Sequence, residues 1–206
     1  MPTELLRETA SQTAGPFLHI GMYPAAAGLP IRTQEQPNVL AGPQAKGQRI
    51  RIEGCVYDGQ GARVTDAQIE IWQADAQGKY NHPDDLQALI PDSGFSGFGR
   101  AVADFDSGLW WFETVKPGAV PAPGGGQMAP HVSLLIFARG INIHLHSRLY
   151  FADEAQANAD DALLQRIDPA ARRETLLAQP RQVAGQLVYR FDIHLQGDRE
   201  TVFLDI

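Results

Sequence analysis

The fold of this chain is decided by the stretch RIRIEGCVYDGQG (residues 49–61) together with QIEIW at residues 68–72. Ile50 and Ile52 alternate with charged residues, and QIEIW shows the same alternation. Apolar side chains at every second position are typical of a β-strand that buries one face. The segment DGQG (residues 58–61) has the composition of a turn. We therefore predict two strands here and expect them to pair as a hairpin.

The alternation recurs along most of the remaining chain, with turn residues between the segments. About eight short strands with frequent turns predict an all-β fold, a β-sandwich. Twenty glycines and fourteen prolines agree with many turns and few long helices. The further predicted strands are residues 98–105, 109–115, 132–138, 145–151, 187–195 and 201–205.

Two regions depart from the strand pattern. Residues 154–165 and 169–177 have helical character, with Asp168 as the expected N-cap and Pro169 at the first helical position, and they form a short helical insertion. Residues 1–47 have no strong period and contain several Gly-Pro turns, so we interpret them as an extended N-terminal arm that packs on a partner chain. The sandwich domain is then predicted at residues 48–206.

Composition excludes several classes of function. The formal net charge is −7 at pH 7, and affinity for nucleic acid comes mainly from positive charge, so no nucleic-acid partner is expected. No run of about 18 apolar residues is present, which argues against a membrane span. The N-terminal residues lack the apolar core of a secretory signal. The single cysteine, Cys55, excludes an internal disulfide and is expected in the core, so we predict a cytoplasmic protein.

The residues alone give only weak indications of a metal site. His144 and His146 would point to one face of a strand, and such a pair can chelate a transition metal. Arg148 lies on the same predicted face, where a cation disfavours a metal. Tyr80 and His131 stand alone in the sequence and are more often structural. The sequence has no nucleophile elbow, phosphate-binding loop or CxxC pair.

A series of ordered motifs is more specific. They resemble the intradiol ring-cleaving dioxygenases, and the resemblance extends over nearly the whole chain. The matching segments are SQTAGPF (11–17), GCVYD (54–58), IEIWQAD (69–75), GKY (78–80), FGR (98–100), TVKPG (114–118), ARGINIHLH (138–146), RLYF (148–151) and RFDI (190–193).

The resemblance implies a metal site that this chain has lost. In that family the catalytic chain holds a non-haem ferric ion with two tyrosinates and two histidines. Tyr80 matches the first tyrosine and His131 the first histidine, but Val120 and Ser133 fall at the other two ligand positions, and Met128 replaces an arginine. We therefore expect no iron in this chain, with Fe(III) held by a related beta chain.

The resemblance also implies a role for the arm. Two-chain members of the family cleave 3,4-dihydroxybenzoate with O₂ between its hydroxyl-bearing carbons, giving 3-carboxy-cis,cis-muconate in the β-ketoadipate pathway. Their iron-free alpha chain lines the substrate pocket of the beta chain. The matching positions here are Thr13, Gly15, Pro16 and Arg139. An arginine suits an anionic substrate carboxylate, although an inter-chain ion pair is the alternative for Arg139.

Two other interpretations remain open at this stage. The first is a stand-alone metal-dependent enzyme that uses His131 and Tyr80, or His144 and His146. The second is a non-enzymatic β-sandwich binding module, because a fold alone does not determine function.

Overall fold

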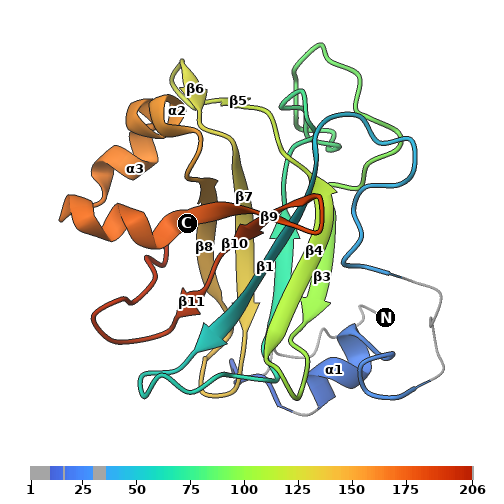
Figure 1. The fold of residues 1–206 in the computed structure, drawn as a ribbon, viewed down its shortest axis with the longest axis vertical. Coiled ribbons are helices and arrows are strands. Elements are labelled where there is room, and N and C mark those ends of the chain that lie inside the picture. Colours follow the sequence, from blue (N-terminus) through green and yellow to red (C-terminus); the bar gives the residue numbers. More distant parts are fainter. Residues whose placement is uncertain (1–9, 16, 30–35, 206) are drawn as a thin grey trace, which may run out of the picture.

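The computed structural model describes residues 10–15, 17–29 and 36–205, and Figure 1 shows the arrangement of their elements. The strands are β1 (Arg49–Tyr57), β2 (Gln68–Trp72), β3 (Phe98–Val102), β4 (Leu109–Val115), β5 (Val120–Pro121), β6 (Gln127–Met128), β7 (His131–Phe137), β8 (Leu145–Phe151), β9 (Leu177–Val183), β10 (Gln186–Arg190) and β11 (Ile193–His194). The helices are α1 (Phe17–Met22), α2 (Ala155–Asp160), α3 (Ala162–Arg166) and a 3₁₀ helix (Ala170–Leu176).

The strands form a sandwich whose two halves are joined at one edge. One half runs β3–β2–β7–β8, and the other contains β4, β1, β10 and β9, with β11 also paired to β1. Strand β9 links the halves, because it pairs in parallel with the end of β8 and antiparallel with β10. Apolar side chains from both halves bury one shared core, with Trp110, Phe112 and Phe151 among its largest members. The predicted all-β sandwich is confirmed.

One glycine shows how closely the backbones pack. Gly54 lies in β1, where the chain of residue 191 crosses: the amide of Phe191 donates a hydrogen bond of 2.9 Å to the carbonyl of Glu53. A Cβ at Gly54 would lie 1.7 Å from the carbonyl oxygen of Phe191. Only glycine fits this approach of one backbone to another.

Strand positions were predicted better than strand partners. Strands β7 and β8, which follow each other in the sequence, pair in an antiparallel hairpin. The predicted hairpin of β1 and β2 is wrong, because β1 pairs with β4, β10 and β11, while β2 pairs with β3 and β7. Residues 201–205 form no strand, and β9 was not predicted, because LAQPRQV contains a proline and lacks apolar alternation. Alternation identifies a buried face but not the neighbouring strand.

The helical insertion is confirmed, with different capping. Asp161 caps α3, since its side chain accepts hydrogen bonds from the amides of Leu163 and Leu164. The predicted N-cap at Asp168 is wrong: Pro169 precedes the 3₁₀ helix, which has no side-chain cap. This second segment is therefore a tighter 3₁₀ helix rather than an α-helix.

The N-terminal region packs partly on its own domain. Leu40 and Ala41 are buried in the sandwich core, and single bridges join Val39 to Glu113 and Ala41 to Phe95. The short helix α1 also lies within this region, near the end of the sandwich opposite to β5 and β6 (Figure 1). Among the described residues, none of the helices has the length and apolar character needed to cross a membrane.

Candidate functional site

Two of the four predicted ligand positions meet at one end of the sandwich. His131 begins β7 and is buried, and Tyr80 follows the end of β2, the strand next to β7. The Tyr80 hydroxyl lies 3.5 Å from Nε2 of His131. Nδ1 of His131 lies 2.7 Å from the carbonyl oxygen of Ala129, which accepts its proton and leaves Nε2 as an acceptor. Tyr80 therefore donates to His131, while its ring stacks on Trp72.

Both side chains are held in their neutral forms. Burial, and then the charge of Arg148, lower the pKa of His131 to about 4, so that the imidazole is uncharged at neutral pH. Burial raises the pKa of Tyr80 above its ordinary value of about 10, so the phenol keeps its proton. Tyr80 and His131 therefore form a hydrogen bond between two neutral side chains, which stabilises their packing. Neither side chain carries a negative charge.

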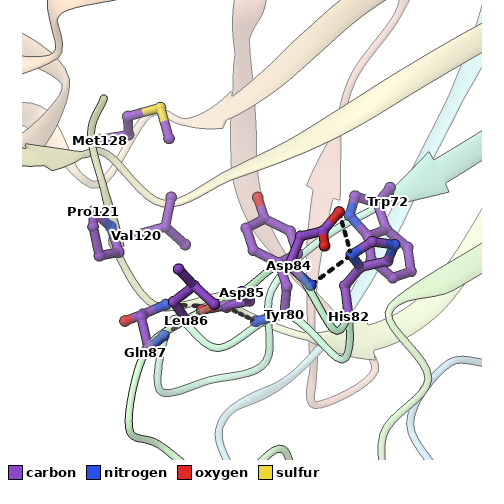
Figure 2. A pocket seen from close by; sticks show the side chains of 10 residues that line it. All are labelled: Trp72, Tyr80, His82, Asp84, Asp85, Leu86, Gln87, Val120, Pro121 and Met128. Atoms are coloured by element: carbon purple, nitrogen blue, oxygen red, sulfur yellow. Dashed lines mark hydrogen bonds and ion pairs between the residues drawn. The ribbon is translucent and has the colours of Figure 1, made fainter. Parts of the chain in front are cut away.

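The other two predicted positions lie beside this pair. Val120 and Tyr80 line a cavity of about 480 Å³, together with Trp72 and Met128 (Figure 2). Ser133 lies two residues after His131 on β7, so it faces the same side of the sheet, directly across from Trp72. We call Tyr80, Val120, His131 and Ser133 the pseudo-site.

One wall of the cavity is a loop that sequence reasoning did not single out. Asp85 accepts hydrogen bonds from the backbone amides of Tyr80 and Gln87, and Lys79 lies 3.1 Å from its carboxylate. Burial acts to raise the pKa of Asp85, but these hydrogen bonds outweigh it and lower the pKa to about 2. The loop therefore holds Tyr80 by its backbone. A loop of this kind has no periodicity by which the sequence reveals its contacts.

The pseudo-site does not fit a ferric ion. Of the four predicted ligand positions, only Tyr80 and His131 keep side chains that coordinate iron readily. Val120 has no lone pair, and the neutral hydroxyl of Ser133 is a poor ligand for a hard trivalent ion. Within the described residues, no group of three or more His, Cys, Asp or Glu side chains is arranged to hold a metal ion. His144 lies outside β8 and packs on Phe137, so the structure does not bring it to the pseudo-site.

The predicted substrate-facing residues meet elsewhere. Thr13 pairs with Asn142 in an antiparallel bridge, its hydroxyl accepts from the amide of Gly140 at 2.9 Å, and it lies 3.4 Å from the carbonyl of Ala138. Arg139 lies between these two contacts. We call Thr13, Gly15 and the turn at residues 138–140 the arm–turn edge. Pro16 lies outside the described residues.

The arm–turn edge presents its charged group to the exterior. The side chain of Arg139 is 71% exposed, and its Nε lies 2.6 Å from a carboxylate oxygen of Asp66. Among the described residues, no atom outside the chain neighbours of Gly15 would lie within 4 Å of a Cβ at that position.

The pseudo-site and the arm–turn edge lie at opposite ends of the same strand (Figure 1). His131 begins β7, and the turn that carries Arg139 follows its last residue, Phe137. Seven strand residues span roughly 20 Å at about 3.3 Å each. Arg139 therefore does not reach a ligand in the pseudo-site of its own chain. Any substrate that it contacts lies outside this chain's pseudo-site.

Comparisons with known proteins agree with the motifs. A family model described as Dioxygenase matches residues 30–197. The chain is 53% identical over 205 residues to the protocatechuate 3,4-dioxygenase alpha chain of Pseudomonas putida, with 100% of both chains covered. It is 40% identical to the alpha chain of Burkholderia cepacia, with 98% of both covered.

More distant relatives extend the comparison. The protocatechuate 3,4-dioxygenase beta chain of Burkholderia cepacia is 31% identical over 166 residues, covering 78% of this chain and 69% of that protein. Among solved structures, 3-chlorocatechol 1,2-dioxygenase from Rhodococcus opacus 1CP has a TM-score of 0.60 at 21% identity, covering 78% of this chain and 65% of that one. This structural likeness supports the fold alone.

Proposed function

Because the chain belongs to the intradiol ring-cleaving dioxygenase family, we propose that it is the alpha subunit of a protocatechuate 3,4-dioxygenase. In the complex with a beta chain, 3,4-dihydroxybenzoate is cleaved with O₂ to 3-carboxy-cis,cis-muconate. The similarity over full length to two alpha chains, and the weaker similarity to a beta chain, support this assignment.

We assign the Fe(III) to the beta chain. The supporting observation is the donor set of the pseudo-site, which offers one phenol, one imidazole, an aliphatic side chain and a neutral hydroxyl. A ferric ion needs anionic oxygen ligands to balance its charge, and of these four side chains only Tyr80 can supply one. The chemistry of ring cleavage then belongs to the partner's iron, and this chain contributes to substrate binding and assembly.

The proposed role in substrate binding is supported by the distance between the two ends of β7, where His131 and Arg139 lie. Arg139 is exposed and lies far from the pseudo-site of its own chain, so a role for it in binding requires the pocket of another chain. The arm brings Thr13 and Gly15 to the same edge, which gives the partner's pocket a wall with one positive charge. The anionic carboxylate of the substrate is complementary to that charge.

We further assign the complex to the cytoplasm, because Cys55 is buried and free, as expected in a reducing compartment. A duplicated fold of this kind favours two chains that meet about a pseudo-twofold axis through equivalent surfaces.

The test is to produce the chain alone and together with its beta partner, and to measure bound iron and turnover of 3,4-dihydroxybenzoate in both. We expect an iron-free, inactive chain alone and an active pair. Stoichiometric iron and turnover in the isolated chain would instead favour a stand-alone metal-dependent enzyme. An isolated chain that binds ligands but never associates with a beta chain would favour a binding module.

A further inference from the structure

Arg148 lies among the residues of the pseudo-site. It is the cross-strand partner of Ser133 in the pairing of β7 with β8, so its side chain leaves the same face of the sheet as Ser133 and His131. Its Nη1 lies 3.5 Å from the sulfur of Met128, the residue that pairs with Val120 across β5 and β6. Its Nε is buried and has no hydrogen-bond partner among the residues that the structure describes.

We propose that Arg148 is a resident cation of the pseudo-site and excludes metal ions from it. The proposal rests on the iron-free role proposed above and extends it. Arg148 then adds a third cause for the absence of iron, besides the replacement of two ligands by Val120 and Ser133. Its position opposite Ser133 on β8 and its contact with Met128 place its guanidinium beside the two family ligand positions that remain, Tyr80 and His131. A metal ion bound between them is repelled by that charge.

Two largely buried carboxylates near the pseudo-site, those of Asp161 and Asp85, already use their oxygens in hydrogen bonds within this chain. One oxygen of Asp161 accepts from the amides of Leu163 and Leu164 and lies 3.3 Å from the Tyr150 hydroxyl, and the other accepts from the amide of Ala129.

Asp85 is committed in the same way. It accepts backbone amides in the cavity loop and is paired with Lys79. Neither carboxylate has an oxygen without a hydrogen bond. The third carboxylate at the cavity, that of Asp84, is 93% exposed to solvent and lies 3.7 Å from His82. The charge left beside the pseudo-site is therefore that of Arg148.

The test restores the lost ligands in the complete complex, with and without the cation. The first variant is Val120→Tyr with Ser133→His, and the second adds Arg148→Gln. Arg148→Lys in the same background is the matched control, because it keeps the positive charge. Metal analysis counts iron beyond that of the beta chain, and the visible tyrosinate-to-iron absorption reports its ligands. Melting temperatures establish that each variant is folded.

We expect additional iron, approaching one equivalent per copy of this chain, only in the Arg148→Gln variant. Additional iron in the variant that keeps Arg148 would overturn the proposal, while the natural chain would still be iron-free. A folded Arg148→Gln variant without additional iron would also overturn it. Iron in the natural chain would refute the proposed function itself, so the two failures are distinguishable.

A milder pair keeps the proposal testable if the triple variant does not fold. Ser133→His alone and Ser133→His with Arg148→Gln both retain Val120 and offer Tyr80 and two histidines to Zn²⁺, which accepts neutral imidazole ligands. Calorimetric titration with Zn²⁺ should give at least about tenfold tighter binding without Arg148, as expected from the Coulomb repulsion between a unit charge and a divalent ion. Equal affinities would contradict the role of Arg148.

Discussion

Replacing Arg139 by alanine in the complete complex separates a substrate contact from a structural ion pair. In this chain Arg139 pairs with Asp66, but its side chain is 71% exposed. An exposed ion pair contributes about 0–1 kcal/mol to stability, so Arg139→Ala should leave folding and assembly nearly unchanged.

The expected effect on catalysis is much larger. A hydrogen bond to a charged group contributes about 1.5–3 kcal/mol, so losing a contact between Arg139 and the substrate carboxylate should lower kcat/KM by roughly 10- to 150-fold. The carboxylate does not react, so the contact acts equally in the ground state and the transition state. The loss should therefore appear as a higher KM with little change in kcat. Oxygen consumption at a series of 3,4-dihydroxybenzoate concentrations measures both constants.

Asp66→Asn is the matched control, because it removes the ion pair and keeps the guanidinium. We expect its kcat/KM to stay within about fivefold of the natural complex, since an exposed pair contributes at most about 1 kcal/mol. An Arg139→Ala complex with an unchanged KM would refute the substrate contact. Equal losses in both variants would show that Arg139 acts through Asp66 rather than on the substrate.

Three further predictions test the fold around the two sites. Gly54→Ala places a Cβ 1.7 Å from the carbonyl oxygen of Phe191, and overpacking of about 3 kcal/mol should lower Tm by roughly 6–12 °C. Gly21→Ala is the control and should change Tm little, because its Cβ would lie within 4 Å of no side chain of the described residues. Asp85 has a pKa of about 2, below the ordinary value of about 4. Its contribution to the stability of the folded chain is therefore complete above pH 4 and is lost as pH falls towards 2. Thermal melts across this range should show that loss in the natural chain and not in Asp85→Asn. Thr13→Ala removes the hydroxyl that accepts a hydrogen bond from the amide of Gly140, so proteolysis of the arm should accelerate. Thr13→Ser keeps a hydroxyl and should be cleaved at the rate of the natural chain. Equal rates in all three proteins would contradict the docking of the arm.

The sequence predicted the strands wherever apolar alternation was strong. Residues 50–56 lie in β1 and residues 145–151 in β8. In β1 both faces are buried over residues 52–56. The charged Glu53 is accommodated there by ion pairs with Arg51 and Arg181. The alternation did not predict which strands pair, because some consecutive strands, such as β1 and β2, lie in different halves, and the same pattern fits either half. Strand β9 was missed because its burial pattern has almost no apolar face to detect.

The candidate residues were identified by resemblance, and their grouping came from the structure. Nothing in the spacing of Tyr80 and His131, 51 positions apart, indicates that their side chains meet. The neighbouring order of β2 and β7 brings them together. Arg148 was placed by its sequence on a face with His146, but its position opposite Ser133 depends on the register of β7 and β8, which the sequence does not specify.

The pseudo-site remains well packed because its residues still serve the fold. His131 holds the segment before β7 through its bond to Ala129, and Asp161 joins that segment to the insertion by accepting the amide of Ala129 while capping α3. A site that lost its metal without such replacements would leave buried polar groups unpaired, which costs stability. The hydrogen bond of Tyr80 to His131 satisfies two polar side chains of the pseudo-site, and in our proposal the charge of Arg148 takes the place of a metal ion. The proposed absence of iron is therefore compatible with a stable end of the sandwich, and the same proposal assigns the wall of a partner's pocket to the opposite end of β7.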